Sequence, residues 1–202
     1  MHKGIFITIE GIEGVGKSTQ IDLLCKHLKD NNINHISTRE PGGLPVSEAI
    51  RKILLHEDID PLTELMLYEA ARAEHFQKVI FPAINSGIAV VCDRFTDSTV
   101  SYQGYGRGLD LKLIDELNAI ATQNTVPDKS FVLDMTVAKA FERLKSRGSK
   151  ADRFERLSHD FYEKVRTGYI NLSKKEPKRV IIINAEKSIK EIHLDIVKNL
   201  GK

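Results

Sequence analysis

Short apolar runs alternate with amphipathic stretches along the chain. Residues 5–9 (IFITI) are β-branched and aromatic, which is typical of a buried strand. After residue 20 the apolar positions are spaced i, i+3, i+4 and i+7, which predicts one face of a helix. These positions are Ile21, Leu24, Cys25 and Leu28.

Four more strand-like runs follow, each separated from the next by helical patterns. They lie at residues 34–38, 88–92, 130–134 and 179–184. Strict alternation of this kind predicts an α/β fold with a central parallel sheet of about five strands, covered by helices on both faces. Ligands of such sheets bind beyond the carboxyl ends of the strands, so the residues after each strand are the candidates for function. We expect one domain over residues 1–202.

Two helices are predicted between the second and third strands. The longer one begins at Asp60-Pro61, and Pro82 is expected to kink or end it. Its expected core face is Leu62, Leu65, Met66, Phe76, Val79 and Ile80. The shorter helix before it is expected to turn Ile50, Ile53 and Leu54 inward.

Composition limits the partners. Thirty Lys and Arg against 28 Asp and Glu give a net charge of +2, too small to argue for nucleic acid or a membrane surface. No apolar run approaches the ~20 residues of a membrane span, and we expect no signal peptide before the first strand. Cys25 and Cys92 lack metal-ligand spacing, so reduced core thiols in a cytoplasmic protein are expected.

The segment Gly11-Ile12-Glu13-Gly14-Val15-Gly16-Lys17-Ser18 matches G-x-x-x-x-G-K-[ST] between the first strand and a helix. Its glycines let backbone N–H groups approach a phosphate, and the helix N-terminus favours the anion. The lysine supplies a point charge for the phosphates and the serine hydroxyl can bind Mg²⁺. The sequence therefore predicts a P-loop NTPase fold, but the loop alone does not say which reaction follows.

Charged residues follow the second and third strands. Arg39 and Glu40 precede a Pro-Gly-Gly turn, where a solvated loop is an equal reading. Asp93 and Arg94 follow the third strand, where a P-loop protein holds Mg²⁺ and an arginine can bind phosphate. Residues 96–108 are rich in hydroxyls and glycines and are interpreted as a mobile substrate loop. Residues 146–156 are basic, which indicates either a flap over phosphates or a solvated loop.

Tyr68 and Arg72 are spaced i, i+4 on the long helix and therefore share a face. Together they could stack on and hydrogen-bond a nucleobase. Helix statistics alone favour a core tyrosine beside a surface arginine.

Taken together, the chain resembles the bacterial thymidylate kinases over nearly its whole length. The resemblance rests on GIEGVGKS, on residues 38–43 (TREPGG), on residues 68–72 (YEAAR), on Asp93-Arg94-Phe95, and on residues 98–108 and 147–155. It implies Mg²⁺-dependent phosphoryl transfer from ATP to dTMP, giving dTDP and ADP for dTTP synthesis. It also implies a homodimer that needs neither nucleic acid nor a membrane.

The resemblance also implies site residues. Tyr68 would stack on thymine where the family usually has Phe, and Tyr102 would exclude a ribose 2′-OH. Asp93 and Ser18 would lie at the metal. The ATP-binding residues implied are Gly11, Ile12, Glu13, Gly14, Val15, Gly16, Lys17, Ser18 and Thr19. The dTMP-binding residues implied are Arg39, Glu40, Pro41, Arg51, Tyr68, Arg72, Arg94, Ser98, Thr99, Tyr102 and Gln103.

The chain resembles the subgroup with a catalytic arginine in a lid, here at about residues 146–157, because its phosphate loop contains no arginine. The implied catalytic residues are Lys17, Arg94, Arg147, Arg153 and Glu13. A phosphate monoester has a second pKa near 6, so the acceptor needs no general base, and alignment with charge stabilisation should carry catalysis.

Three alternatives are weighed at this point. A purely structural or inactive relative is disfavoured because Lys17, Ser18, Asp93 and Arg94 are all present. Another nucleoside monophosphate kinase of the same fold would differ only in base recognition, and hydrogen-bond orientation is invisible in a sequence. A GTP-dependent switch would use N-K-x-D and D-x-x-G, and neither motif is present.

Overall fold

A computed structural model describes residues 3–146 and 157–201. Five parallel strands form one sheet in the order β2-β3-β1-β4-β5, so β1 is central. Phe6 pairs with Val90 of β3, and Ile7 pairs with Lys129 of β4. The strands are β1 (Phe6–Glu10), β2 (His35–Arg39), β3 (Ala89–Asp93), β4 (Lys129–Asp134) and β5 (Val180–Asn184).

Each strand begins within one residue of its predicted position, so the expected parallel α/β sheet is confirmed. The central strand β1 is buried at all five positions, and β3 at its first four. Strands covered on both faces need apolar side chains on both sides, which is why the sequence shows continuous apolar runs there.

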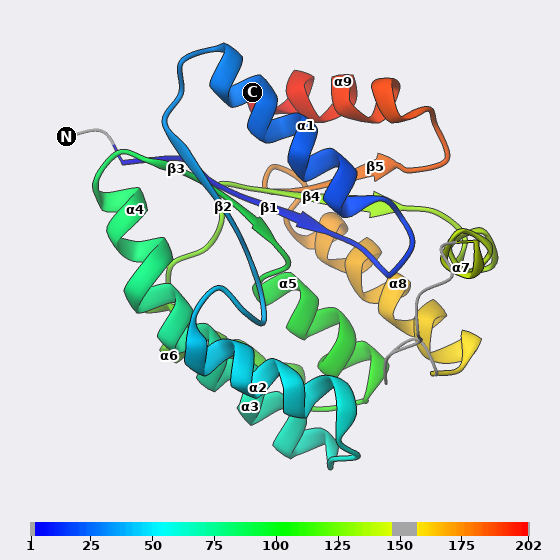
Figure 1. Cartoon of the computed structure of the whole chain (residues 1–202). Coiled ribbons are helices and arrows are strands. Elements are labelled where there is room, and N and C mark those ends of the chain that lie inside the picture. Colours follow the sequence, from blue (N-terminus) through cyan, green and yellow to red (C-terminus); the bar gives the residue numbers. More distant parts are fainter. Residues whose placement is uncertain (1–2, 147–156, 202) are drawn as a thin grey trace.

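Helices cover both faces of the sheet (Figure 1). On one face, α1 (Lys17–Asp30) packs against β2 and β3, and α9 (Ile189–Leu200) packs against β5 and α1. On the other face, α4 (Phe81–Asn85) contacts β3, and α8 (His159–Lys175) contacts β5. The remaining helices are α2 (Pro45–His56), α3 (Pro61–His75), α5 (Thr96–Thr99), α6 (Leu111–Thr122) and α7 (Val137–Lys145).

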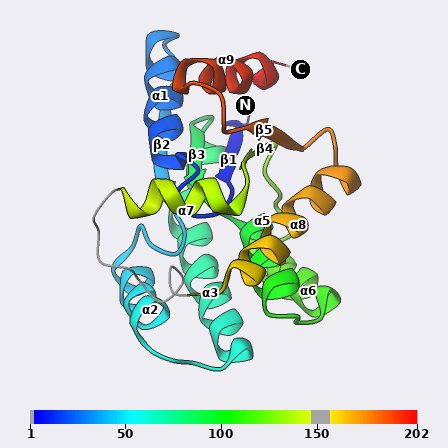
Figure 2. The ribbon, with the colours of Figure 1, turned by 90° about the vertical axis from the view of Figure 1, so that its right-hand side faces the viewer.

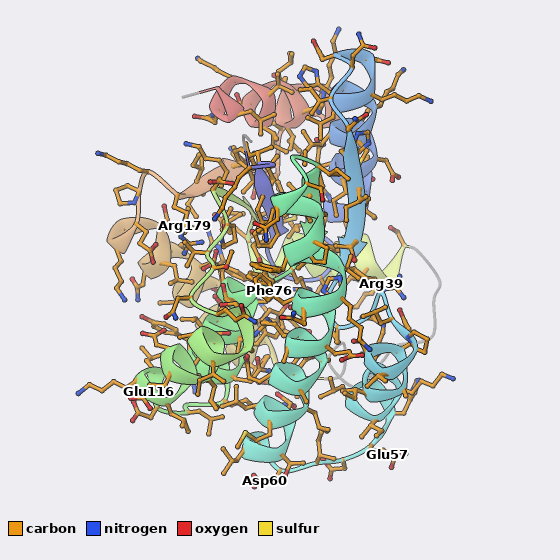
Figure 3. The ribbon with its side chains drawn as sticks, turned by 90° about the vertical axis from the view of Figure 1, so that its left-hand side faces the viewer. Arg39, Glu57, Asp60, Phe76, Glu116 and Arg179 are labelled. Atoms are coloured by element: carbon orange, nitrogen blue, oxygen red, sulfur yellow. The ribbon has the colours of Figure 1, made fainter. Side chains whose placement is uncertain are left out.

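The helix that begins at Asp60 continues past Pro82 instead of stopping there. The side chain of Asp60 accepts from the backbone N–H of Leu62, as its cap position predicts. A π-helical segment, Phe76–Ile80, joins α3 to α4, and Figure 3 shows Asp60 and Phe76 on this one continuous run. Because Pro82 has no N–H and its ring would collide with a carbonyl in an ordinary turn, a wider π turn lets the helix continue.

Residues 96–108 are largely helical, so the interpretation as a mobile loop was wrong. Thr96–Thr99 form α5, and Val100–Gly106 form the π-helical segment η2. Residues 97–104 are buried, and η2 packs on α8. Glycines gave this segment the composition of a loop, but Gly104 serves packing, since a Cβ there would lie 2.4 Å from Leu111 Cδ2.

The predicted inward faces of α2 and α3 are partly wrong. Leu54 and Leu65 are fully buried, but Ile53, Leu62 and Met66 are 41–51% exposed. Each helix therefore presents apolar side chains on two faces, one toward the core and one away from it.

Figure 2 looks toward the carboxyl ends of the strands, where α2, α3, α7 and α8 surround the end of the sheet. Because β1, β2 and β3 are parallel, the loops that follow them all lie at this one edge. In the part of the chain that the structure describes, no helix has the length and apolar character needed to cross a membrane.

Candidate active site

A cavity of about 330 Å³ opens at this edge of the sheet. Its walls come from the phosphate loop, the end of β2, helices α2 and α3, the end of β3, the α5–η2 segment and α7. All the residues implied for dTMP binding line it, as do Ser18 and Asp93. The lining residues are Glu13, Gly14, Gly16, Lys17, Ser18, Arg39, Glu40, Pro41, Arg51, Leu55, Tyr68, Arg72, Asp93, Arg94, Ser98, Thr99, Tyr102, Gln103 and Leu144.

The phosphate loop has the backbone that its glycines predict. Gly14 has a φ of 82°, and a Cβ there would lie 2.3 Å from the carbonyl oxygen of Ala140. Gly16 caps α1 in the left-handed conformation, so α1 begins at Lys17 with free N–H groups toward the cavity. Lys17 Nζ donates to the Gly11 and Ile12 carbonyls at 3.3 and 3.2 Å.

The predicted ATP-binding residues divide into two groups. Glu13, Gly14, Gly16, Lys17 and Ser18 line the cavity, whereas Gly11, Ile12, Val15 and Thr19 do not. Ile12 and Val15 are buried in the main core, where they anchor the loop. Burial and the positive charge of Arg94 lower the pKa of Lys17 to about 8, so an incoming phosphate would meet a charged ammonium at neutral pH.

Asp93 and Arg94 end β3 beside the phosphate loop. Oδ1 of Asp93 is buried and has no hydrogen-bond partner among residues 3–146 and 157–201. An orphaned carboxylate oxygen at a cavity that Ser18 also lines suits Mg²⁺, which takes one or two protein ligands together with phosphate oxygens. Within the described ranges, no group of three or more His, Cys, Asp or Glu side chains is placed to hold a metal ion.

Arg94 has a φ of 69°, a left-handed conformation that is strained for a non-glycine residue and recurs at functional sites. Its Nη2 donates to Glu13 Oε1 at 2.8 Å and to the Tyr102 hydroxyl at 3.1 Å. That hydroxyl donates to Glu13 Oε2 at 2.6 Å. Burial acts to raise the pKa of Glu13, but Arg94 and Lys17 outweigh it and hold the pKa below its usual value. Glu13 is therefore an ionised partner for Arg94.

A second carboxyl, that of Glu10, is buried next to the start of α5. Glu10 is fully buried and accepts from the backbone N–H of Phe95 at 2.8 Å, from Ser98 Oγ at 2.6 Å and from the Tyr169 hydroxyl at 3.2 Å. Burial and the nearby charge of Asp97 raise the pKa of Glu10 to about 8. Glu10 thus fixes the start of α5, and with it Ser98, at the cavity wall.

Arg72 is buried, with 2% of its side chain exposed, and is not the surface arginine of helix statistics. Its Nε donates to Glu40 Oε2 at 2.8 Å, and its Nη1 lies within hydrogen-bond distance of Glu69, Thr99 and Asn118. A buried guanidinium requires such partners. The Thr99 hydroxyl accepts from Arg72 and is therefore already engaged.

Glu40 has a second partner that the sequence did not reveal. His75, fully buried on α3, lies 2.9 Å from Glu40 Oε1 through Nδ1 and 2.6 Å from Thr38 Oγ1 through Nε2. Glu40 is held between Arg72 and His75 and keeps a fixed position at the cavity edge.

Arg39 and Arg51 approach the cavity from the β2–α2 side. Arg39 is 51% exposed and donates from Nη2 to Glu48 Oε1 at 2.6 Å; Figure 3 shows it at the end of β2. Arg51 Nη1 donates to the Pro41 carbonyl at 3.0 Å. Both arginines line the cavity, so an anion that enters it meets positively charged side chains on this side.

Tyr68, from α3, and Gln103, from η2, both line the cavity. Burial raises the pKa of Tyr68 above its usual value, so its hydroxyl stays protonated. Gln103 Nε2 donates to Glu64 Oε1 at 2.8 Å. Arg147 and Arg153, the predicted lid arginines, lie outside the described residues.

Several residues that shape the site escaped the sequence analysis: Glu10, Glu64, Glu69, His75 and Asn118 are all buried and polar. The sequence did contain one signal of these buried polar groups: polar residues at positions 64, 69, 72 and 75 interrupt the apolar stretches of α3. Leu55 and Leu144 are further lining residues without a sequence signal.

Comparisons with known proteins agree with this architecture. A sequence model of the thymidylate kinase family matches residues 9–196. The thymidylate kinase of Pelotomaculum thermopropionicum is 45% identical over 199 residues, which are 97% of this chain and 92% of that protein. The thymidylate kinase of Geotalea uraniireducens is 47% identical, covering 93% of this chain and 92% of that one. The crystal structure of the Ehrlichia chaffeensis thymidylate kinase superposes with a TM-score of 0.80 at 37% identity, covering 98% and 99% of the two chains.

The phosphate loop opens into a cavity that is also lined by arginines. This arrangement defines a P-loop kinase whose acceptor itself carries a phosphate. The family match spans almost all of that architecture. The chain belongs to the thymidylate kinase family, whose members transfer a phosphoryl group from ATP to dTMP and release dTDP and ADP.

Proposed function

We propose that this transfer takes place in the 330 Å³ cavity, with Mg²⁺, and with the residue roles given below. The observation that carries the proposal is that the phosphate-loop lysine, Lys17, lines the same cavity as Arg94, Tyr68 and Arg72. Donor and acceptor phosphates can meet only where both binding sets face one space.

The donor phosphates bind the loop from Gly11 to Thr19. Backbone N–H groups at the start of α1 and the Lys17 ammonium surround them. Ser18 and Asp93 would hold Mg²⁺ for the donor nucleotide, and the orphaned Oδ1 of Asp93 supports that role. When bound, the ion neutralises charge that develops on the transferred group.

The acceptor phosphate binds among three guanidinium groups, those of Arg39, Arg51 and Arg94. Arg94 is held by Glu13 and Tyr102 before a ligand arrives, so its position costs little to organise on binding. The phosphate is mostly dianionic at neutral pH, so it can attack without a proton acceptor. Catalysis then comes from alignment and charge stabilisation in a space closed to water.

The deoxyribose and the base occupy the wall formed by α3 and η2. Tyr68 stacks on the base, while Arg72 and Gln103 contact its edge, with Thr99 behind them. Tyr102 lies against the sugar and excludes a 2′-OH, and Glu40 contacts the 3′-OH. Pro41 and Ser98 complete the wall, and all these residues line the cavity.

The lid, at about residues 146–157, remains a prediction that rests on the resemblance alone. In the proposal it closes over the phosphates and brings Arg147 or Arg153 to the transferred group. A lid arginine would take the role that an arginine in the phosphate loop has in other kinases.

The experiment that tests the function is a coupled assay of ADP release with ATP and Mg²⁺. Each nucleoside monophosphate is offered in turn, and product formation is confirmed by chromatography. Turnover with dTMP well above that with AMP, GMP or CMP is expected, together with loss of turnover on chelation of Mg²⁺. Preference for a purine monophosphate would overturn the base assignment, and turnover that ignores the acceptor would overturn the kinase assignment.

The chain is also proposed to act as a homodimer in the cytoplasm. Cys25 and Cys92 are free thiols, which suits a reducing compartment. Exposed apolar side chains gather on α2, α3 and α6, which pack side by side. Exposed apolar patches of this kind are typical of protein interfaces.

A further inference from the structure

Glu64, on the first turn of α3, places a carboxylate behind the cavity wall. Its side chain is 0% exposed, and it does not line the cavity. Arg107 donates to it from Nη2 at 2.9 Å and from Nε at 3.2 Å. The Arg107 guanidinium also lies over the Phe161 ring, 5.1 Å from its centre. The Arg107 guanidinium is therefore fixed by both Glu64 and the Phe161 ring.

The ion pair of Glu64 and Arg107 determines which end of the Gln103 amide faces Glu64 and which end faces the cavity. A carboxylate paired with a guanidinium offers only lone pairs, so the amide end that faces it must be the nitrogen. Gln103 Nε2 donates to Glu64 Oε1 at 2.8 Å, and Gln103 itself is buried at the cavity wall. The carbonyl Oε1 is therefore the end of Gln103 that remains to accept a hydrogen bond from a ligand.

Arg72, on the same wall, has only N–H groups to offer. Thr99 accepts from Arg72, so its oxygen is used within the protein. A base that meets both Arg72 and Gln103 must then present an acceptor to the first and a donor to the second. A 4-oxo pyrimidine does so with O4 and N3–H, whereas cytosine presents an amino group and a bare ring nitrogen.

We propose that Glu64, fixed by Arg107, is a positioning residue that sets the amide of Gln103 and so makes the site accept 4-oxo pyrimidines and reject 4-amino ones. Glu64 touches no substrate and acts through Gln103. The inference rests on the proposed function, because it takes the base to lie against Arg72 and Gln103. It adds the reason why the Gln103 amide has the orientation that distinguishes one pyrimidine acceptor from another.

The first test is Glu64→Gln, assayed with dTMP and dCMP as acceptors. A glutamine at 64 can either donate or accept, so the amide of Gln103 can turn. We expect the ratio of kcat/KM for dTMP to kcat/KM for dCMP to fall by roughly tenfold or more, because the buried groups no longer hold the Gln103 amide in one orientation. A variant that lowers kcat/KM by the same factor for both acceptors would overturn the inference.

A double-mutant cycle separates positioning from general damage. In the Gln103→Leu background there is no amide to orient, so adding Glu64→Gln should leave the dTMP:dCMP ratio unchanged. A further fall in that background would mean that Glu64 does not act through Gln103. Arg107→Lys keeps a cation beside the carboxylate and should keep the ratio of the unaltered protein.

If Glu64→Gln does not fold, Arg107→Leu tests the same point. It leaves a buried carboxylate without the guanidinium that fixes it, so the carboxylate no longer holds the Gln103 amide in one orientation. The same fall in ratio is expected, and an unchanged ratio would overturn the inference. Absence of dTMP turnover in the unaltered protein would instead overturn the proposed function.

Discussion

Asp93 and Asp134 are the last residues of the two strands that flank β1, but their surroundings differ. Both oxygens of Asp134 accept from Arg166, at 2.7 and 2.9 Å. Asp93 lines the cavity and keeps a buried Oδ1 without a partner among the described residues. Of two chemically identical side chains, only Asp93 has an oxygen left for a cation.

Asp93→Asn should therefore weaken the response to Mg²⁺. We expect kcat to fall on the order of 10²-fold and the Mg²⁺ concentration for half-maximal rate to rise, because an amide oxygen carries no charge. Titration of Mg²⁺ at saturating ATP and dTMP measures both. Asp134→Asn is the matched control and should leave the half-maximal concentration unchanged; the same shift in both variants would contradict the assignment of Asp93.

Glu10 gives a residue-scale prediction about pH. Its carboxyl keeps its proton to about pH 8 in the folded chain but would lose it near 4.5 when unfolded. Between these values the native state binds the extra proton, so the free energy of unfolding falls as pH rises, by up to ~1.4 kcal/mol per pH unit. Glu10→Gln does not titrate, so the stability advantage of wild type over the variant should shrink from pH 5 to pH 8.

Urea denaturation at several pH values measures that difference. The control is Glu186→Gln, at an exposed carboxyl whose pKa is lowered by Lys139, which should give a constant difference over the same range. A constant difference for Glu10→Gln as well would show that the Glu10 carboxyl is already ionised in the folded chain.

The lid arginines form a prediction from sequence resemblance alone. Arg147→Ala or Arg153→Ala should lower kcat by on the order of 10³-fold with little change in dTMP affinity, because the charge acts on the transferred group. Steady-state kinetics of both variants decide which arginine acts. If both keep a kcat near that of the unaltered protein, the lid has no part in the chemistry.

At the scale of elements, α8 and η2 meet at unusually short range. Gly168 of α8 faces η2, where a Cβ would lie 2.9 Å from Tyr105 Cδ2 and 3.0 Å from the Cα of Ser101. The α5–η2 segment supplies Thr99, Tyr102 and Gln103 to the cavity. This close contact therefore sets the position of one whole wall of the site.

Gly168→Ala should destabilise the fold by about 1–3 kcal/mol, because the backbone at Ser101 must move. The steric cost is expected to exceed the ~1 kcal/mol by which alanine favours a helix over glycine. Chemical denaturation measures the change. Gly201→Ala, where nothing lies within 4 Å of the added Cβ, is the control and should stay within ~0.5 kcal/mol of wild type. Equal stability of the two variants would argue against tight packing at α8.

The strands and the phosphate loop could be predicted because their signals are local. Each strand is a continuous apolar run, and the loop is a contiguous motif between a strand and a helix. The helix at residues 96–106 was missed because its glycines and hydroxyls indicate a loop when read locally. Its burial comes from α8, more than fifty residues further along the chain.

The candidate site could be predicted from the sequence only where its residues lie in local motifs or at the ends of strands. Residues at strand ends converge by topology, so Arg39, Asp93 and Arg94 were found together. The groups that hold them come from distant segments: Asn118 reaches Arg72 across 46 residues, and Gln103 reaches Glu64 across 39. No local pattern encodes such pairs, and only the fold shows them.

At the scale of the whole molecule, the exposed apolar side chains are unevenly spread. Most of the large ones on the described residues lie on α2, α3 and α6: Val46, Ile53, Leu62, Met66, Leu111, Leu113 and Ile120. These three helices lie side by side in the lower half of Figure 3. Ile189 and Leu194 on α9 are as exposed but lie apart from this group.

Leu62→Glu and Met66→Glu should therefore convert a dimer into a monomer, because two like charges would meet across an apolar interface. Size-exclusion chromatography with light scattering should give twice 22.8 kDa for the unaltered chain and 22.8 kDa for these variants. Ile189→Glu and Leu194→Glu make the same change at similar exposure, 59% and 55%, and should remain dimeric. A monomeric unaltered chain would end the proposal of a dimer, and a dimer broken only by the α9 variants would move the interface to the opposite face of the sheet.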